Sequence, residues 1–166
     1  MLENISGYEL HPNSTTYVPT NYLNIDPQGL SAAVVFTAPS PGFYQVAGQF
    51  LGNDVVGNPH PVSVIENGTS TLSSGVIASY GQTSPFDLML SLNAGDTIAF
   101  DVGTGSTGCS FCFLSTGLWA EVTTSSAPII IPEPLYPIQT AVSPEPEMLP
   151  FLGGALAALA CLRKRG

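Results

Sequence analysis

Apolar and polar side chains alternate over several short segments, and this two-residue period constrains the fold more than any other feature. In the segment FYQVAGQF, Tyr44, Val46 and Phe50 fall on one face of an extended chain, whereas Gln45 and Gln49 fall on the other. Successive side chains of a β-strand point to opposite faces, so the pattern predicts half-buried strands. The same alternation gives three further inward-facing sets: Phe86, Leu88, Leu90 and Leu92; Ile98, Phe100 and Val102; and Leu118, Ala120 and Val122.

Turn signals separate these segments. The alternating Val62 and Val64 precede Asn67-Gly68, a dipeptide typical of tight β-hairpins, and residues 93–96 predict a second turn. An apolar strand at residues 31–37 brings the expected total to about eight, with no helical pattern before the C-terminal tail. We therefore expect an all-β domain in which two antiparallel sheets pack face to face.

The charge distribution excludes several kinds of partner. The twelve carboxylates are spread from Glu3 to Glu147, whereas the three basic residues are consecutive, at Arg163, Lys164 and Arg165. Residues 1–143 thus hold ten carboxylates and no Lys or Arg. Such a surface cannot neutralise phosphates, so we expect no binding to nucleic acid or to anionic lipid headgroups.

Two cysteines form a C-x-x-C pattern at Cys109 and Cys112, and the third, Cys161, lies in an apolar segment. In an oxidising compartment this pattern predicts a local disulfide, with an unpaired thiol pair or a metal site as alternatives.

The start of the chain, MLENISGYEL, has neither the basic region nor the apolar region of a signal peptide. We expect that the natural chain begins upstream.

The C-terminal tail holds three blocks in order. Pro144-Glu145-Pro146 cannot be helical, residues 148–162 are apolar, and Arg163-Lys164-Arg165 closes the chain. A basic cluster after an apolar run stays in the cytoplasm, which places the preceding domain outside. We expect this run to form a short transmembrane helix that anchors the chain in the bacterial membrane before processing, although as a helix it spans only ~22 Å. Residues 125–143 are rich in proline and predict an extended linker.

This arrangement resembles the PEP-CTERM sorting signal of Gram-negative bacteria, although Glu147 stands where a small residue is common. The resemblance implies that an exosortase, a membrane-embedded protease, acts on the tail. An ordinary single-span anchor is the alternative. Many proteins with a PEP-CTERM signal carry a jelly-roll domain that is similar to carbohydrate-binding modules. Segments of this chain, including TAPSPGFYQVAGQF and FDLMLSLNAGDTIAFDVG, resemble that domain. The expected organisation is a truncated N-terminal segment (1–19), a jelly-roll sandwich (20–124), the linker (125–143) and the tail (144–166).

Trp119 is the only tryptophan, and its apolar neighbours Leu118 and Ala120 predict that it faces outward. An exposed aromatic ring on a sheet can stack on a sugar ring. Candidate glycan contacts are therefore Trp119, Tyr80 and two polar residues of a loop, Asn53 and Asp54. The alternative is that Trp119 covers backbone or packs on residues upstream.

We expect no catalytic residues, because no catalytic motif occurs and His11 and His60 are the only histidines. A glycosidase would need a carboxylate pair, for which Asp87, Asp96 and Asp101 are candidates. We expect no cofactor, with a structural calcium ion on Asp54, Asn58 and Asp101 as an alternative. The sequence thus predicts an exported surface or secreted protein whose sandwich associates with exopolysaccharide or another glycan. Its rivals are a purely structural envelope or biofilm-matrix protein and a hydrolase fragment.

Overall fold

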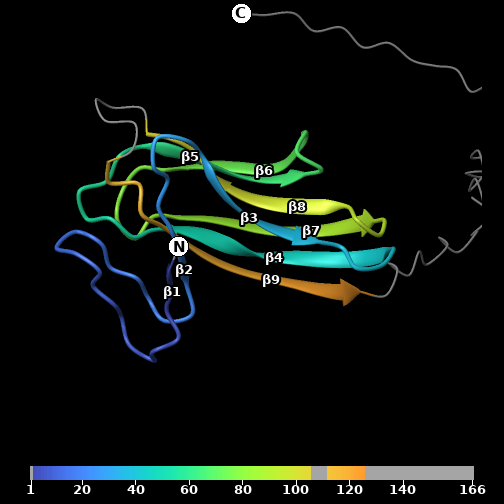
Figure 1. Ribbon diagram of the computed structural model, residues 1–166, viewed down its shortest axis with the longest axis horizontal. Coiled ribbons are helices and arrows are strands. Elements are labelled where there is room, and N and C mark those ends of the chain that lie inside the picture. Colours follow the sequence, from blue (N-terminus) through green and yellow to red (C-terminus); the bar gives the residue numbers. More distant parts are fainter. Residues whose placement is uncertain (1, 106–111, 126–166) are drawn as a thin grey trace, which may run out of the picture. The chain divides into compact units, whose positions relative to one another are not determined.

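The computed structural model of the chain describes residues 2–105 and 112–125. Its described part contains nine strands (Figure 1). Their bounds are β1 (Leu2–Glu3), β2 (Leu23–Ile25), β3 (Ala32–Thr37), β4 (Gly42–Gly52), β5 (His60–Glu66), β6 (Ser70–Ile77), β7 (Thr83–Leu92), β8 (Thr97–Val102) and β9 (Thr116–Ser125).

The strands form two antiparallel sheets. One sheet has five strands in the order β1-β2-β9-β4-β7, and the other has four in the order β3-β8-β5-β6. The chain crosses repeatedly from one sheet to the other, as at β3 to β4 and at β7 to β8 to β9. This is the order of a jelly-roll sandwich with β1 added to one edge, and it confirms the predicted fold class.

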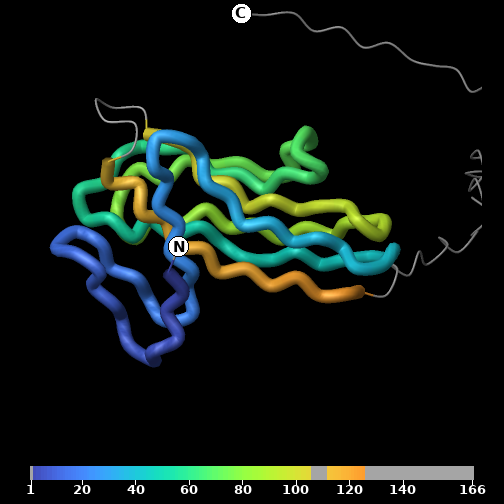
Figure 2. The backbone as a smooth tube through the Cα atoms, in the orientation of Figure 1, coloured from blue at the N-terminus to red at the C-terminus, as the bar shows by residue number. Residues whose placement is uncertain are grey.

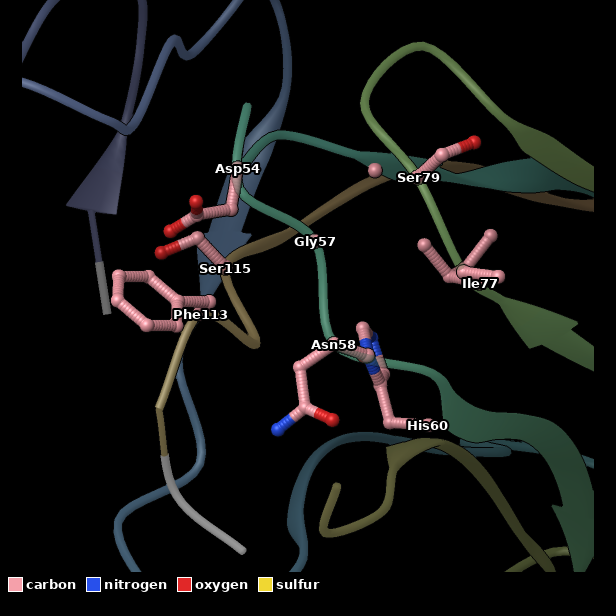
Figure 3. Close-up of a pocket in the computed structure, with 10 residues that line it drawn as sticks. Asp54, Gly57, Asn58, His60, Ile77, Ser79, Phe113 and Ser115 are labelled. Atoms are coloured by element: carbon pink, nitrogen blue, oxygen red, sulfur yellow. The ribbon is translucent and has the colours of Figure 1, made fainter. Parts of the chain in front are cut away.

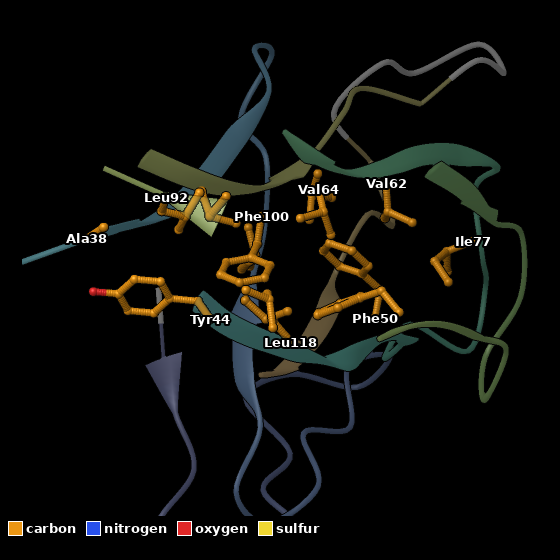
Figure 4. Close-up of a cluster of buried hydrophobic side chains, with 14 residues drawn as sticks. Ala38, Tyr44, Phe50, Val62, Val64, Ile77, Leu92, Phe100 and Leu118 are labelled. Atoms are coloured by element: carbon orange, nitrogen blue, oxygen red, sulfur yellow. The ribbon is translucent and has the colours of Figure 1, made fainter. Parts of the chain in front are cut away.

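The predicted alternation places the core between the sheets (Figure 4). Tyr44, Val46 and Phe50 of β4 are at most 2% exposed. The Phe86 ring lies between those of Phe50 and Phe100, with centroid distances of 5.6 Å and 5.5 Å, and so joins the two sheets. Each such buried side chain contributes about 1.5–3 kcal/mol to folding, so this shared core holds the sheets together.

Both predicted turns are present. Asn67 and Gly68 have positive φ angles of 49° and 68°, as the tight hairpin between β5 and β6 requires. In the second turn the Asn93 N–H donates to the Asp96 carboxylate, at 2.6 Å. The Asn67 amide group also donates to Asp96, at 3.1 Å, so the two turns are tied together at one end of the sandwich.

The N-terminal segment lies at one end of the sandwich before the chain enters β3 (Figure 2). Its β1 pairs with β2, which extends the five-stranded sheet. The buried Asn4 amide donates to the carbonyls of Tyr8 and Val18, at 2.8 and 2.7 Å, which fixes the loop that follows.

Ala120 points into the sandwich as predicted, yet it is exposed, because the sandwich is open beside β9. The expected linker and sorting tail, residues 125–143 and 144–166, lie outside the described residues except for Ser125. Among the described residues there is no helix long and apolar enough to cross a membrane.

Candidate functional site on the outer sheet face

Trp119 lies on the outer face of the five-stranded sheet. It stands in β9 directly opposite Gln49 of β4. Its indole is 43% exposed, whereas its neighbour Leu118 points into the core and is 4% exposed. The outward orientation predicted from the apolar neighbours is therefore present.

Two open hollows lie on this sheet face, one against Trp119 and one at the next outward positions of β4 and β9. One hollow, of about 370 Å³, is bordered by the indole itself. The other, of about 240 Å³, has the small side chain of Ala47 as part of its lining. We call the residues around the two hollows the Trp119 face: Thr20, Asn21, Tyr22, Gln49 and Trp119 at the first, and Gln45, Ala47, Glu121 and Thr123 at the second.

Tyr22 is held in the Trp119 face by two contacts. Its ring packs against Gly117, where an added Cβ would lie 2.9 Å from Tyr22 Cδ1, so the absence of a side chain makes room for the ring. Its hydroxyl accepts a hydrogen bond from Gln49 Nε2. The tyrosine and the glutamine thus fix each other in the lining of the hollow beside Trp119.

Carboxylates border the same sheet face. Glu121 and Asp87 lie on either side of Ala47, on β9 and β7 respectively. Adjacent strands are ~4.8 Å apart, so the two backbones are separated by about 10 Å. Asp87 accepts a hydrogen bond from Gln45 Nε2 at 3.1 Å.

The three carboxylates considered for a catalytic pair are not brought together. Asp87 belongs to the five-stranded sheet, whereas Asp101 lies in β8 of the other sheet, between Ala33 and Ser63. Asp96 lies in the turn before β8, where the Asn93 N–H and the Asn67 amide hold the pKa of its carboxyl below the usual range. The described structure therefore gives no support to that pair.

Tyr80 lies elsewhere. It is 47% exposed in the turn between β6 and β7, as expected for a polar loop. Its ring packs edge-on against Tyr17, at 5.6 Å between centroids, and Tyr17 packs likewise against His11 at 4.3 Å. Tyr80 lines neither hollow of the Trp119 face, so these two aromatic residues do not form one site.

The side chains of Asn53 and Asp54 are buried, which corrects the expectation that they are available to a ligand. Asn53 is 0% exposed, its side chain lies against Gly117, and its Nδ2 donates to Asn24 Oδ1 of β2 at 3.0 Å. Asp54 is 5% exposed and accepts hydrogen bonds from the Thr15 hydroxyl and the Val56 N–H. Both side chains hold the N-terminal segment against the end of the sandwich.

A second concave region lies at this end, lined by Asp54, Asn58, His60, Phe113 and Ser115 among others (Figure 3). It is too tight to admit a water-sized molecule. We therefore regard it as a packed polar cluster that positions loops.

His60 is the histidine of this cluster. It is 3% exposed, and its Nδ1 lies 2.6 Å from the Asn58 carbonyl oxygen. Its Nε2 lies 2.7 Å from the Thr116 hydroxyl. Burial lowers the pKa of this imidazole, and the bond to the Asn58 carbonyl opposes that shift only in part.

The calcium alternative receives no support from the described residues. Asp54 and Asn58 line the tight cluster, whereas Asp101 lies on the outer face of the other sheet. In the described ranges no three His, Cys, Asp or Glu side chains lie close enough to bind a metal ion.

Cys112 is disulfide-bonded. Its expected partner, Cys109, lies outside the described residues, so the pairing stays a prediction. The Cys112 carbonyl also accepts a hydrogen bond from Asn58 Nδ2 at 2.9 Å, which ties this loop to the polar cluster.

Sequence reasoning missed Tyr22 and Gln49 as neighbours of Trp119. The alternation in β4 did place Gln49 on the outer face. Nothing local placed Tyr22 there, because its position depends on β2 pairing with residues 116–118 of β9.

Comparisons with known proteins find distant similarity in shape. No family model matches the chain, and no curated protein matches it in sequence. A family 35 carbohydrate-binding module from an environmental isolate is 15% identical, with a TM-score of 0.39, over 74% of this chain and 90% of that one. The Podospora anserina GH26-CBM35 β-(1,4)-mannanase is 13% identical, with a TM-score of 0.41, over 76% of this chain and 27% of that one.

A protein of a different kind is similar to the same degree. Pika GITRL is 13% identical, with a TM-score of 0.38, over 72% of this chain and 96% of that one. Similarities at this level identify no ligand for the chain, so a functional proposal depends on its own surface.

Proposed function

We propose that the domain binds glycans through the Trp119 face. The observation that carries this proposal is the half-exposed Trp119, which borders a hollow lined by the amide and hydroxyl groups of Thr20, Asn21, Tyr22 and Gln49. An aromatic ring stacks on the C–H face of a sugar, and neighbouring amides and hydroxyls bond to the sugar hydroxyls. Tyr22 and Gln49 supply such groups already held in place.

The charge of the domain favours neutral glycans. The described residues hold nine of the twelve carboxylates and no Lys or Arg, and Glu121 lies in the Trp119 face itself. An anionic polysaccharide would be repelled from this surface. Stacking on one ring adds about 1 kcal/mol beyond the buried area, so we expect a Kd in the roughly micromolar to millimolar range.

We propose binding without catalysis. Glycoside hydrolysis needs two carboxyl groups that flank the scissile bond. Among the residues that line the two hollows, Glu121 is the one carboxylate. Asp87, across Ala47, is engaged by Gln45.

Affinity electrophoresis of the full chain tests the proposal. Native gels would contain one neutral polysaccharide each, such as a β-glucan, a mannan or a galactan, with an anionic alginate gel for comparison. We expect at least one neutral polysaccharide to slow migration and alginate to have no effect. Unchanged migration in all gels would contradict glycan binding and favour a purely structural surface protein.

We further propose that the protein is exported and carries a sorting tail. The support is the order of Pro144-Glu145-Pro146, the apolar residues 148–162 and Arg163-Lys164-Arg165. This order resembles the PEP-CTERM signal, for which an exosortase would be the processing partner. The sandwich would then act outside the cytoplasmic membrane, in the envelope or an extracellular matrix.

Mass spectrometry of protein extracted from the cell surface tests the tail. In cells that hold an exosortase, mature chains should lack Arg163-Lys164-Arg165. An intact C-terminus on all mature chains would argue for an ordinary membrane anchor. Because this test concerns only the tail, its failure leaves the glycan proposal standing.

A further inference from the structure

Among the described residues, most of β9 has no partner strand on one of its two edges, which we call the free edge. β2 pairs only with residues 116–118, whereas β4 pairs along the whole strand on the other side. Within the described part of the chain, no backbone hydrogen bond reaches residues 119–124 from the β2 side. Figure 1 shows this stretch of β9 at the margin of its sheet, beyond β1 and β2. Unpaired strand edges readily accept another strand.

The two long sides of the sandwich differ. On one side β6 and β7 close against each other, and the Ser84 hydroxyl occupies the place that a Cβ on Gly75 would need. On the other side β9 and the edge strand β3 leave a cleft of about 290 Å³. We call it the edge cleft.

The edge cleft is bordered by side chains that point into the sandwich, of which Ala120 is exposed and Val34 and Val122 are half-buried. Its lining includes the core residues Phe100 and Leu118 together with Val34, Ala120 and Val122, all of which point inward. Ala120 is exposed there although its place in the alternation belongs to the core. A free strand edge and a cleft lined by apolar side chains thus lie side by side. An added strand would form backbone hydrogen bonds with the free edge, and its inward side chains would cover the apolar side chains of the cleft.

We propose that the free edge of β9 binds an extended segment of another protein as an additional strand. That segment would alternate apolar side chains, which enter the edge cleft, with Lys or Arg side chains on the outer face. The edge cleft shares Asn21 and Trp119 with the first hollow, and Glu121 lines the second, so a strand bound here would lie beside the Trp119 face. The inference itself rests on the unpaired edge and the cleft, and it is tested without any glycan.

The preference for basic residues comes from charge. Glu121 faces outward on the free edge, and Glu3 stands at the border of the cleft. Neither has a Lys or Arg to balance it, since the described residues contain none. A basic strand would place its charges beside Glu121, which raises both specificity and the rate of association. A second copy would bring the same acidic surface and be repelled, so we commit to a basic partner.

Hydrogen–deuterium exchange on the full chain tests the proposal. The probe is a short synthetic peptide that alternates valine with lysine, and its matched control replaces each lysine by glutamate. At a lysine-peptide concentration about ten times its Kd, exchange should slow about tenfold for those amides of residues 119–124 that point to the free edge rather than to β4. The glutamate peptide should have little effect.

Two substitutions locate the site. Ala120→Lys places a charge in the edge cleft and should abolish protection by the lysine peptide. Ala33→Lys makes the same change on the outer face of β3, where Ala33 is exposed, and should preserve protection. If either variant fails to fold, the comparison of the two peptides on the unchanged chain still tests the proposal.

Three outcomes would overturn the proposal. The first is no slowing of exchange at millimolar lysine peptide, and the second is equal slowing by the two peptides. The third is protection of residues 119–124 that rises with protein concentration in the absence of peptide, which would assign the edge to a second copy.

Discussion

Trp119 and Gln49 face each other across the β9–β4 pair on the outer face of the five-stranded sheet, and the Gln49 amide donates to the Tyr22 hydroxyl. The indole therefore lies beside a polar group that is already fixed. A ligand that stacks on Trp119 would find this partner without the cost of ordering it. The pair makes the Trp119 face testable by small changes that leave the core intact.

Tyr22→Phe removes the hydroxyl that holds Gln49 and keeps the ring against Gly117. We expect retention on a neutral polysaccharide to fall severalfold, with a loss of about 0.5–1.5 kcal/mol in stability. Affinity electrophoresis and urea unfolding measure the two effects. Tyr8→Phe, at a tyrosine that is 66% exposed in the N-terminal segment, is the matched control and should change neither. Unchanged retention in Tyr22→Phe would remove Tyr22 and its bond to Gln49 from the site.

Stability should depend on pH through His60. Burial lowers the pKa of His60 in the folded protein below the unfolded value of about 6.5. Between these two pKa values the unfolded chain binds more protons, so stability decreases as the pH falls below about 6.5 towards the folded pKa. Urea unfolding at a series of pH values around this window measures the decrease.

Two variants separate His60 from other titrating groups. His60→Gln should lower stability at neutral pH, because it disrupts the bonds to Asn58 and Thr116, and should flatten the dependence on pH in this window. His11→Gln, at the exposed histidine, should keep the dependence. If a folded His60→Gln protein shows the same dependence of stability on pH as the unchanged protein, His60 is not its cause.

Gly48→Ala should destabilise the sandwich. A Cβ at Gly48 would overlap with the Trp119 carbonyl oxygen and lie 2.7 Å from Phe86 Cζ. Such overpacking costs about 1–3 kcal/mol. Gly42→Ala is the control, because its nearest neighbour is Tyr44 Cε2 at 3.9 Å, and it should change stability little. Equal urea midpoints for the two variants would show that β4 and β9 adjust freely at Gly48.

The disulfide of Cys112 should be formed with Cys109. Protein purified without reductant should give a peptide in which these two cysteines are linked, detected by mass spectrometry without reduction. A link from Cys112 to Cys161, or alkylation of both Cys109 and Cys112 before reduction, would contradict this pairing.

The alternation of side chains was sufficient to predict the sandwich. The inward positions of Tyr44, Phe50 and Phe100 and the hairpin at Asn67-Gly68 depend on local geometry, which a strand and its turn impose on their own sequence. The outward position of Trp119 followed from the same rule.

The remaining features depend on contacts between distant segments. Asn53 is buried against residues far from it in the chain, and Tyr22 reaches Gln49 only through the pairing of β2 with β9. Ala120 has the sequence pattern of a core residue, and its exposure results from the short length of β2 beside β9. The alternation of side chains within one strand does not indicate which distant segments will pack against it.

Trp119→Ala tests the central proposal most directly when retention and stability are measured together. Retention of the full chain on a neutral polysaccharide that slows the unchanged protein should be lost or fall at least severalfold, while stability changes by no more than about 0.5 kcal/mol. Met89→Ala is the matched control, since Met89 is 50% exposed in β7 of the same sheet, and it should alter neither quantity. A large loss of stability in Trp119→Ala with unchanged retention would contradict the proposal, because Trp119 would then be a packing residue.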